Sequence, residues 1–185
     1  MATKSPMSFE QYAALEEPVG ERWELSHGEL IVTPSATLRH NEIRDRVNVL
    51  LRTFPEIRKL GVVCSELDTR LAEDTVRRPD VMFFRAGKLD SIDLDRVPIP
   101  VAPDLAIEIV SQNDRADDLM QKVSDYLLAG VQAVWLMYPK TGLAYRYSPS
   151  KREPEVYYAA TGDTFTEPDL LPGFSMLLSG IFAYA

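Results

Sequence analysis

The chain has no long apolar run and only one cysteine, and both absences narrow the class of protein. None of its 185 residues falls in a stretch approaching the roughly 20 consecutive apolar residues of a membrane-spanning helix. Cys64 has no second cysteine to pair with and lies in an apolar, strand-like run, so we interpret it as a buried structural thiol. No apolar signal core follows the N-terminal residues 1–6. These features predict a cytoplasmic protein with no membrane partner.

Basic charge is also scarce. The chain carries 20 lysines and arginines against 28 aspartates and glutamates, a net charge of −8, which argues against broad, non-specific binding to nucleic acid. The charge is uneven, because residues 36–80 hold nine basic and eight acidic side chains, a net +1 that leaves −9 to the remainder. This distribution allows a local basic surface near the first long helix, although the acidic total counts against a nuclease.

Hydrophobic periodicity and turn residues predict an α/β domain. With 45% apolar and 26% charged residues, the composition is that of an ordinary globular protein, and we expect a single domain over residues 1–185 with its core at about 8–182. The helices are expected at 9–15, 37–54 and 114–129, the first with a capping box at Ser8 and the last with Asp114 as its N-cap. The strands are expected at 23–25, 30–32, within 62–72, 80–84, 104–110, 131–137 and 143–147.

These elements predict a mixed β-sheet with a helix on each side. His27-Gly28 is expected to form a two-residue hairpin turn, and the strand–helix–strand unit over 104–137 to be right-handed. Residues 85–102 are expected to form a long surface connection. Residues 155–160 and 163–166 predict an added antiparallel meander, and 178–184 a closing segment.

Two carboxylates stand beside strands that are otherwise apolar. Glu108 interrupts the aliphatic run at 105–110, and Asp80 precedes the apolar residues 81–84. An unpaired carboxylate in such a place costs several kcal/mol, so the chain must supply a partner or a metal ion. Because Mg²⁺ prefers oxygen ligands and needs only one or two carboxylates, we predict a Mg²⁺ site at Asp80 and Glu108, with the backbone carbonyl of Ile109 as a further ligand and Mn²⁺ as a substitute.

Simpler interpretations of the same carboxylates remain open. Asp80 could be a strand-start aspartate that accepts hydrogen bonds from local backbone N–H groups. Glu108 could be the buried partner of Arg77 or Arg78. Asp104, four residues before Glu108, is interpreted as a turn residue at the strand entry.

Lys122 is the candidate basic residue of the site. It lies on the helix at 114–129, at the border of the apolar stripe formed by Leu119, Val123, Tyr126 and Leu127, from which a lysine can reach inward. There it could help to deprotonate a water or stabilise a phosphate. The alternative is a surface ion pair with Asp118, four residues earlier.

Each histidine has an ordinary structural interpretation. His40 falls on the apolar side of the helix at 37–54, as is typical of a hydrogen-bonded core histidine, and His27 is a turn residue to which we assign no function.

Several short motifs occur together in a known family. They are Pro79-Asp80, Glu-Ile-Val-Ser at 108–111, Lys122 with 126–131, Trp-Glu-Leu at 23–25 with 28–30, and Val-Trp-Leu at 134–136 with Pro139. Together they resemble the Uma-two family of restriction-endonuclease-like proteins, within the PD-(D/E)xK nuclease superfamily, over about residues 8–182. The resemblance implies a restriction-endonuclease-like fold and Mg²⁺-dependent hydrolysis of phosphodiester bonds in DNA. It also implies that Glu24 and His40 face the site beside Asp80, Glu108 and Lys122.

One position departs from the superfamily pattern. The lysine of that pattern lies two residues after the glutamate, where this chain has Val110, so Lys122 is the candidate replacement. Two competing functions therefore stay open: a non-catalytic interaction module that keeps the fold, and a hydrolase of another acidic substrate. We also expect a homodimer, because a two-fold pair places two sites across a duplex and Tyr145, Tyr147, Tyr157 and Tyr158 could supply an aromatic interface.

Overall fold

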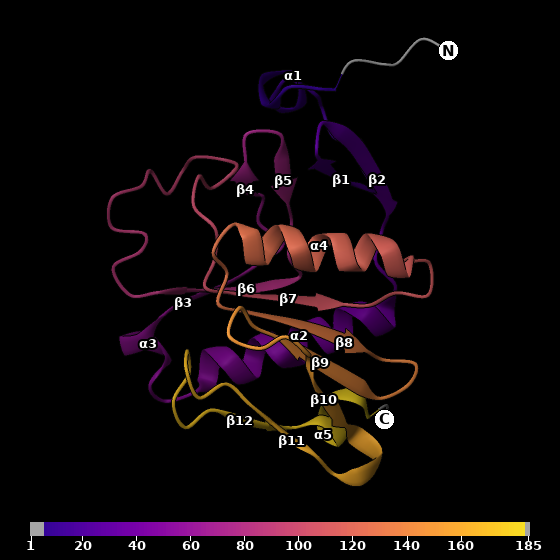
Figure 1. Cartoon of the computed structure of the whole chain (residues 1–185), viewed down its shortest axis with the longest axis vertical. Helices are drawn as coiled ribbons and strands as arrows, with labels where there is room; N and C mark the ends of the chain where they lie inside the picture. Colours follow the sequence, from indigo (N-terminus) through magenta and orange to yellow (C-terminus); the bar gives the residue numbers. More distant parts are fainter. Residues whose placement is uncertain (1–5, 184–185) are drawn as a thin grey trace.

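A six-stranded mixed sheet forms the centre of the protein (Figure 1). The structure is a computed structural model that describes residues 6–183. The strands follow the order β10-β9-β8-β7-β6-β3. Their bounds are β3 Gly61–Ser65, β6 Val81–Arg85, β7 Leu105–Ile109, β8 Ala133–Tyr138, β9 Leu143–Tyr147 and β10 Glu155–Tyr158. Neighbours are antiparallel except β7 and β8, which are parallel and are connected by α4 (Ala116–Leu128), as the expected strand–helix–strand unit requires.

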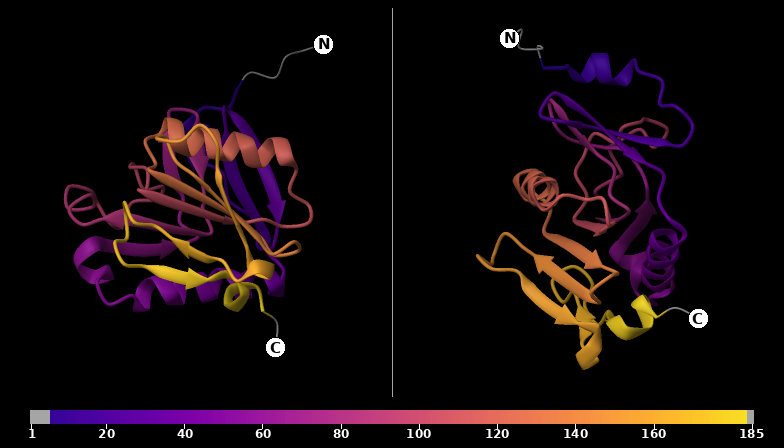
Figure 2. Two further views of the ribbon diagram at one scale, coloured as in Figure 1. Left: turned by 60° about the horizontal axis from the view of Figure 1, so that its bottom comes forward. Right: turned by 90° about the vertical axis from the view of Figure 1, so that its right-hand side faces the viewer.

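Two long helices cover opposite faces of this sheet (Figures 1 and 2). On one face, α2 (Leu38–Thr53) packs Ile43, Val47 and Leu51 against the odd-numbered residues of β6, β7 and β8. On the other face, α4 packs Leu119, Val123 and Tyr126 against Ala106, Val134 and Leu136. Because side chains alternate along a strand, Glu108 shares the α4 face with Ala106. This explains why a glutamate in a fully buried strand can meet residues of α4.

A second sheet, with strand order β2-β1-β5-β4, brings the N-terminal hairpin to the same region. Its strands are β1 Glu21–Ser26, β2 Glu29–Pro34, β4 Thr69–Ala72 and β5 Thr75–Arg77. The predicted two-residue turn is confirmed, with φ of 50° at His27 and 76° at Gly28. Trp23 and Leu25 of β1 pack beside α1 (Phe9–Ala13), whose capping box at Ser8 is also confirmed. The alternate residues of β1 face a cavity.

The C-terminal part covers the α2 face. There η1 (Ala159–Thr161), β11 (Thr164–Thr166), β12 (Ser175–Leu177) and α5 (Leu178–Phe182) complete the fold, while α3 (Ile57–Leu60) lies between α2 and β3. The predicted meander is divided, because β10 extends the main sheet while β11 pairs with β12 in a separate two-stranded sheet. Phe165 and Phe174 of this part pack on Trp135. The expected closing segment is the helix α5, and its last predicted residue, Tyr184, lies outside the described residues.

Three expectations about local roles need correction or qualification. Asp114 is not the N-cap of α4: the cap is Arg115, and Asp114 Oδ2 instead accepts a hydrogen bond from the Ser111 N–H at 2.7 Å, which closes the preceding turn. Of the four tyrosines, Tyr145, Tyr147 and Tyr157 are half-buried and pack on the core, and only Tyr158, 48% exposed, lies mainly in solvent. Cys64 is half-buried, and burial raises its pKa, which disfavours a reactive thiolate.

Among the helices of residues 6–183, none has the length and apolar character needed to cross a membrane.

Candidate active site

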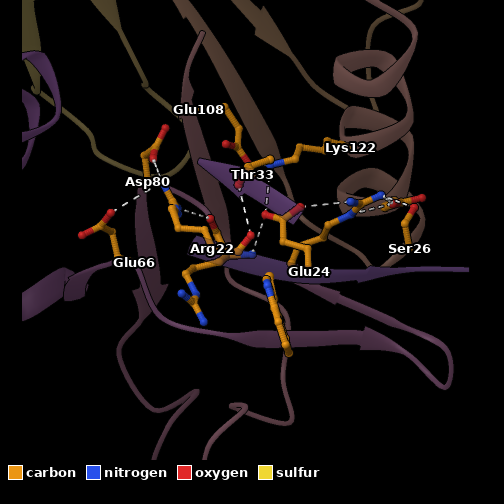
Figure 3. A network of polar contacts seen from close by, with 12 residues as sticks. Arg22, Glu24, Ser26, Thr33, Glu66, Asp80, Glu108 and Lys122 are labelled. Carbon is orange, nitrogen blue, oxygen red and sulfur yellow. Dashed lines mark hydrogen bonds and ion pairs between the residues drawn. The ribbon is translucent and has the colours of Figure 1, made fainter. Parts of the chain in front are cut away.

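Asp80 is held by three hydrogen bonds from three different elements. Its Oδ2 accepts the backbone N–H of Ile109 at 2.7 Å, and its Oδ1 lies 2.9 Å from His40 Nε2 and 3.1 Å from Arg22 Nη1 (Figure 3). The backbone donor is on β7, the neighbouring strand, so Asp80 is not satisfied by its own turn. Burial alone would raise the pKa of Asp80, but His40 and Arg22 more than offset it, and the pKa is lowered. Because an ionised aspartate only accepts hydrogen bonds, His40 must carry its proton on Nε2.

Glu108 lies opposite Asp80, one residue beyond the pair formed by Val81 of β6 and Ile107 of β7. Its Oε1 accepts a hydrogen bond from Tyr126 Oη at 2.6 Å and lies 3.5 Å from Lys122 Nζ. No hydrogen bond from a described residue reaches Oε2. Burial raises the pKa of Glu108 to about 7; Lys122 opposes this rise, and the nearby Asp80 and Glu24 carboxylates reinforce it.

Lys122 turns inward and joins the two carboxylates of different sheets. Its Nζ lies 3.0 Å from Glu24 Oε1 and 3.5 Å from Glu108 Oε1. The Asp118 side chain is exposed, and its Oδ2 lies 4.0 Å from Arg115 Nε. Burial would lower the pKa of Lys122, but Glu108 and Glu24 more than offset it, so the pKa is raised and the ammonium form is favoured. The surface ion pair with Asp118 is therefore not formed.

Glu24 is fixed by Arg77, one of the two arginines that the sequence left open as partners of Glu108. Arg77 Nη1 donates to Glu24 Oε2 at 3.0 Å, and the Arg77 guanidinium also reaches Asp125 Oδ2 on α4 at 2.6 Å. Burial would raise the pKa of Glu24, but Lys122 and Arg77 more than offset it, and the pKa is lowered. Arg78 binds Glu17 and Asp68 instead. Neither arginine is the partner of Glu108, because Arg77 of β5 points to Glu24 of β1 and Asp125 of α4, and Arg78, which follows β5, points to Glu17 and Asp68.

Other polar contacts of the site were missed by sequence reasoning. His27 is a turn residue as expected, but its Nε2 lies 2.9 Å from Asp125 Oδ1, so the hairpin tip touches α4. The sequence pattern placed the Tyr126 ring in the apolar stripe of the helix but gave no partner for its hydroxyl, which binds Glu108. Arg22 carried a usable signal, because it alternates with Glu24 on β1 and must share its face. Asp104 is at the other end of β7, where it accepts hydrogen bonds from the Arg85 N–H and from Lys88, as a strand-entry residue.

The site residues surround a cavity of about 340 Å³ between the two sheets. Both sheets and both long helices contribute: Arg22 and Glu24 come from β1, Glu108 from β7, Asp80 from the residue before β6, Lys122 from α4 and His40 from α2. All five predicted site residues, Asp80, Glu108, Lys122, Glu24 and His40, therefore meet in one place.

Comparisons with known proteins show the family and the fold of this chain. A sequence model of the family described as Uma2, "Putative restriction endonuclease", matches residues 9–179. The chain belongs to the Uma2 (Uma-two) family. A crystal structure described as a putative nuclease belonging to DUF820 from Anabaena variabilis is similar in fold, with a TM-score of 0.84 and 20% sequence identity over 96% of this chain and 98% of that chain. A comparison with curated proteins finds no match.

In this Uma2 protein Val110, two residues after Glu108, brings no basic group to the site. Val110 packs half-buried against the apolar cluster under α4. Lys122, one turn before Tyr126 on that helix, brings its ammonium to within 3.5 Å of Glu108 Oε1. The ammonium that contacts Glu108 therefore comes from α4 and not from β7.

The donor set of the site fits a hard divalent cation bound mostly through water. Among residues 6–183, no three His, Cys, Asp or Glu side chains are grouped so as to hold a metal ion. Two carboxylates are nonetheless enough for Mg²⁺, which keeps several of its waters. Glu108 has one carboxylate oxygen without a hydrogen bond from the described residues, and its raised pKa means that added positive charge nearby is favourable. Asp80, by contrast, already carries three hydrogen bonds.

Proposed function

We propose that this Uma2 protein is a Mg²⁺-dependent endonuclease that hydrolyses phosphodiester bonds of DNA in the cytoplasm. One observation carries the proposal: a carboxylate with a free oxygen, a second carboxylate on the adjacent strand and a protonated lysine line one cavity. These are the groups that a phosphodiester hydrolase needs, and the family description and the fold of the DUF820 nuclease support the same chemistry.

In this proposal Asp80, Glu108 and the carbonyl of Ile109 would hold Mg²⁺, or Mn²⁺ in its place. The bound ion would supply a more acidic water and would neutralise charge that develops on the phosphate. His40 donates its Nε2 proton to Asp80, and Tyr126 donates to Glu108, so both carboxylates keep a fixed orientation. Orientation of this kind spares the reaction the cost of ordering its catalytic groups.

Lys122 would act as a positive charge and not as a base. Its pKa is raised by Glu108 and Glu24, so it has no free lone pair near neutral pH with which to accept a proton. An ammonium held at the cavity wall can stabilise the extra negative charge of the pentavalent phosphate. Glu24 fixes this ammonium at 3.0 Å and is itself fixed by Arg77.

The proposal is tested by metal titration before any DNA is added. Isothermal calorimetry with Mg²⁺ or Mn²⁺ should detect binding by the wild type and not by Asp80→Ala. Asp104→Ala is the matched control, because Asp104 is also a buried aspartate at an end of a central strand but faces away from the cavity. Metal-dependent nicking of plasmid DNA should follow the same pattern. If the wild type binds neither ion, the non-catalytic module becomes the better interpretation.

A homodimer is part of the same proposal. Two sites related by a two-fold axis could cut both strands of a duplex, and closed dimers are the commonest oligomers. Tyr145, Tyr147 and Tyr157 pack on the core. Of the four tyrosines expected at the interface, Tyr158 would therefore contribute most of the aromatic surface. Light scattering at micromolar concentration should give twice the chain mass of 20.9 kDa, and a mass of one chain would exclude the dimer.

A further inference from the structure

Arg22 occupies the Asp80 carboxylate that a metal ion would need. Its Nη1 lies 3.1 Å from Asp80 Oδ1, and its Nη2 donates to the backbone carbonyl of Arg78 at 3.1 Å. The same Oδ1 also accepts the proton of His40 Nε2, so both of its lone pairs are used. A divalent ion bound at this oxygen would lie within a few ångströms of the guanidinium charge, and the two positive charges would repel each other.

A second acceptor for Arg22 lies next to Asp80. Arg22 Nη1 is 3.5 Å from Glu66 Oε1, so the guanidinium lies between the two carboxylates (Figure 3). The backbone of Glu66 is held by its N–H, which donates to the Pro79 carbonyl at 3.2 Å. Arg44 binds the other oxygen of Glu66 at 2.8 Å and leaves Oε1 for Arg22. A small movement of the guanidinium could therefore exchange Asp80 for Glu66 and keep the Arg78 carbonyl as an anchor.

We propose that Arg22 is a positioning residue that neutralises Asp80 in the metal-free protein and moves to Glu66 when a divalent cation binds. The proposal rests on the proposed Mg²⁺ site. Arg22 keeps the buried carboxylates of the empty site from repelling one another, and it lowers the affinity for metal because it must first be displaced. Removing its charge therefore has opposite effects on two quantities: the metal-free protein becomes less stable, while Mg²⁺ binds more tightly. A merely structural arginine would not give this pair of effects.

The test compares Arg22→Gln with the matched control Arg44→Gln. Both arginines are mostly buried, with 19% and 15% of their side chains exposed, and both bind Glu66, but only Arg22 binds Asp80. Calorimetry should show Mg²⁺ binding to Arg22→Gln tightened by about tenfold, the change that 1.4 kcal/mol of relieved repulsion gives. Thermal unfolding in chelator should show a lower Tm for Arg22→Gln, and added Mg²⁺ should raise its Tm more than that of the wild type. Arg44→Gln should keep wild-type Mg²⁺ affinity.

Two further variants keep the test decisive. Arg22→Lys retains the charge and should keep Mg²⁺ affinity near that of the wild type, which separates charge from packing. Glu66→Gln removes the second acceptor at a partly exposed position and should weaken Mg²⁺ binding, because Arg22 then stays on Asp80. This variant also provides a result if Arg22→Gln does not fold.

The outcomes separate this inference from the proposed function. Mg²⁺ binding by the wild type together with unchanged or weaker binding by Arg22→Gln would overturn the role of Arg22 and leave the metal-dependent nuclease intact. Unchanged Mg²⁺ binding by Glu66→Gln would overturn the exchange between Asp80 and Glu66. Absence of Mg²⁺ binding in both the wild type and Arg22→Gln would overturn the proposed metal site itself, and the role of Arg22 with it.

Discussion

Two clusters of buried charge in this protein differ in how completely their carboxylates are satisfied. The first, which we call the Arg146 cluster, consists of Arg146, Trp135, Glu155, Glu167 and Asp169. Arg146 holds the fully buried Glu167 with two hydrogen bonds, at 2.8 and 2.6 Å, and Trp135 Nε1 adds a third at 3.0 Å. Both oxygens of Glu167 are occupied, and none of these residues lines the active-site cavity.

The second, the cavity cluster, consists of Arg22, Glu24, Asp80, Glu108 and Lys122. Glu108 keeps one oxygen without a hydrogen bond from the described residues, and its pKa is raised to about 7. Burial of charge is common to both clusters and therefore does not identify a functional site. The incomplete neutralisation of a carboxylate at a cavity wall distinguishes the second cluster, because such a group can still bind a ligand.

The largest expected effect is the loss of function in Glu108→Gln. The amide keeps the shape of the side chain but has no charge with which to bind a cation, so metal binding and cleavage should both become undetectable. The fold should tolerate the change, because neutral Glu108 is already accessible near pH 7. Calorimetry measures the metal binding, plasmid nicking the cleavage, and thermal unfolding the stability of the fold. Retained cleavage would show that Glu108 belongs with the structural carboxylates.

The corresponding change in the Arg146 cluster should damage stability instead. Glu167→Gln removes the fully buried counter-charge of Arg146 and leaves only the more exposed Glu155 and Asp169, at an expected cost of up to about 3–5 kcal/mol in the free energy of unfolding. Urea denaturation measures this cost. Cleavage per folded molecule and Mg²⁺ affinity should stay at wild-type values, and a specific loss of either one would break the distinction between the clusters.

Within the cavity cluster, Lys122→Met should separate turnover from metal binding. The variant keeps the apolar stem and removes the charge, so cleavage should fall by roughly 10², as for other transition-state donors. Mg²⁺ affinity should not fall, because Lys122 contacts Glu108 Oε1 and leaves Oε2 free for the ion. The measurement is single-turnover cleavage beside calorimetry. Wild-type cleavage by Lys122→Met would show that Lys122 does not compensate for Val110.

The smallest expected effect is a pH dependence of stability. The pKa of Glu108 is raised from its usual 4.5 to about 7, so between these values the folded protein binds this proton more tightly than the unfolded chain. Metal-free wild type should therefore lose stability as pH rises from 4.5 to 7, by at most about 1.4 kcal/mol per pH unit. Urea denaturation in chelator should show a flatter profile for Glu108→Gln. Parallel profiles would mean that Glu108 is ionised throughout this range.

Much of the fold could be predicted from local sequence, because its central elements have strong patterns. The apolar strands β6, β7 and β8, the amphipathic helices α2 and α4, and the His27-Gly28 turn all lie where periodicity and turn residues placed them. The prediction fails at the ends of elements, because a single hydrogen bond decides which residue caps a helix. Asp114 is an example, since its carboxylate closes a turn and does not cap α4.

The site was predictable only in part. Asp80 and Glu108 stand out because each is a lone charge beside an apolar strand, and Lys122 because it borders an apolar stripe. The pairings around these residues have no local signal: Arg77 meets Asp125 across 48 positions, and Arg22, although it shares a strand face with Glu24, meets Asp80 across 58. Such pairings depend on how the two sheets are placed against each other, which no local pattern specifies. Arg146 and Glu167, 21 positions apart, were missed for the same reason.

The hairpin turn sets the parity of the strand that carries Arg22 and Glu24. In β1 these two residues face the cavity, while Trp23 and Leu25 face the apolar cluster at α1. Inserting or deleting one residue between Glu24 and the turn would exchange the two faces and bring tryptophan and leucine to the cavity. A change that leaves every charged residue in the chain would then abolish the site. We therefore expect length variation among relatives to be confined to other connections, such as the loop between β6 and β7.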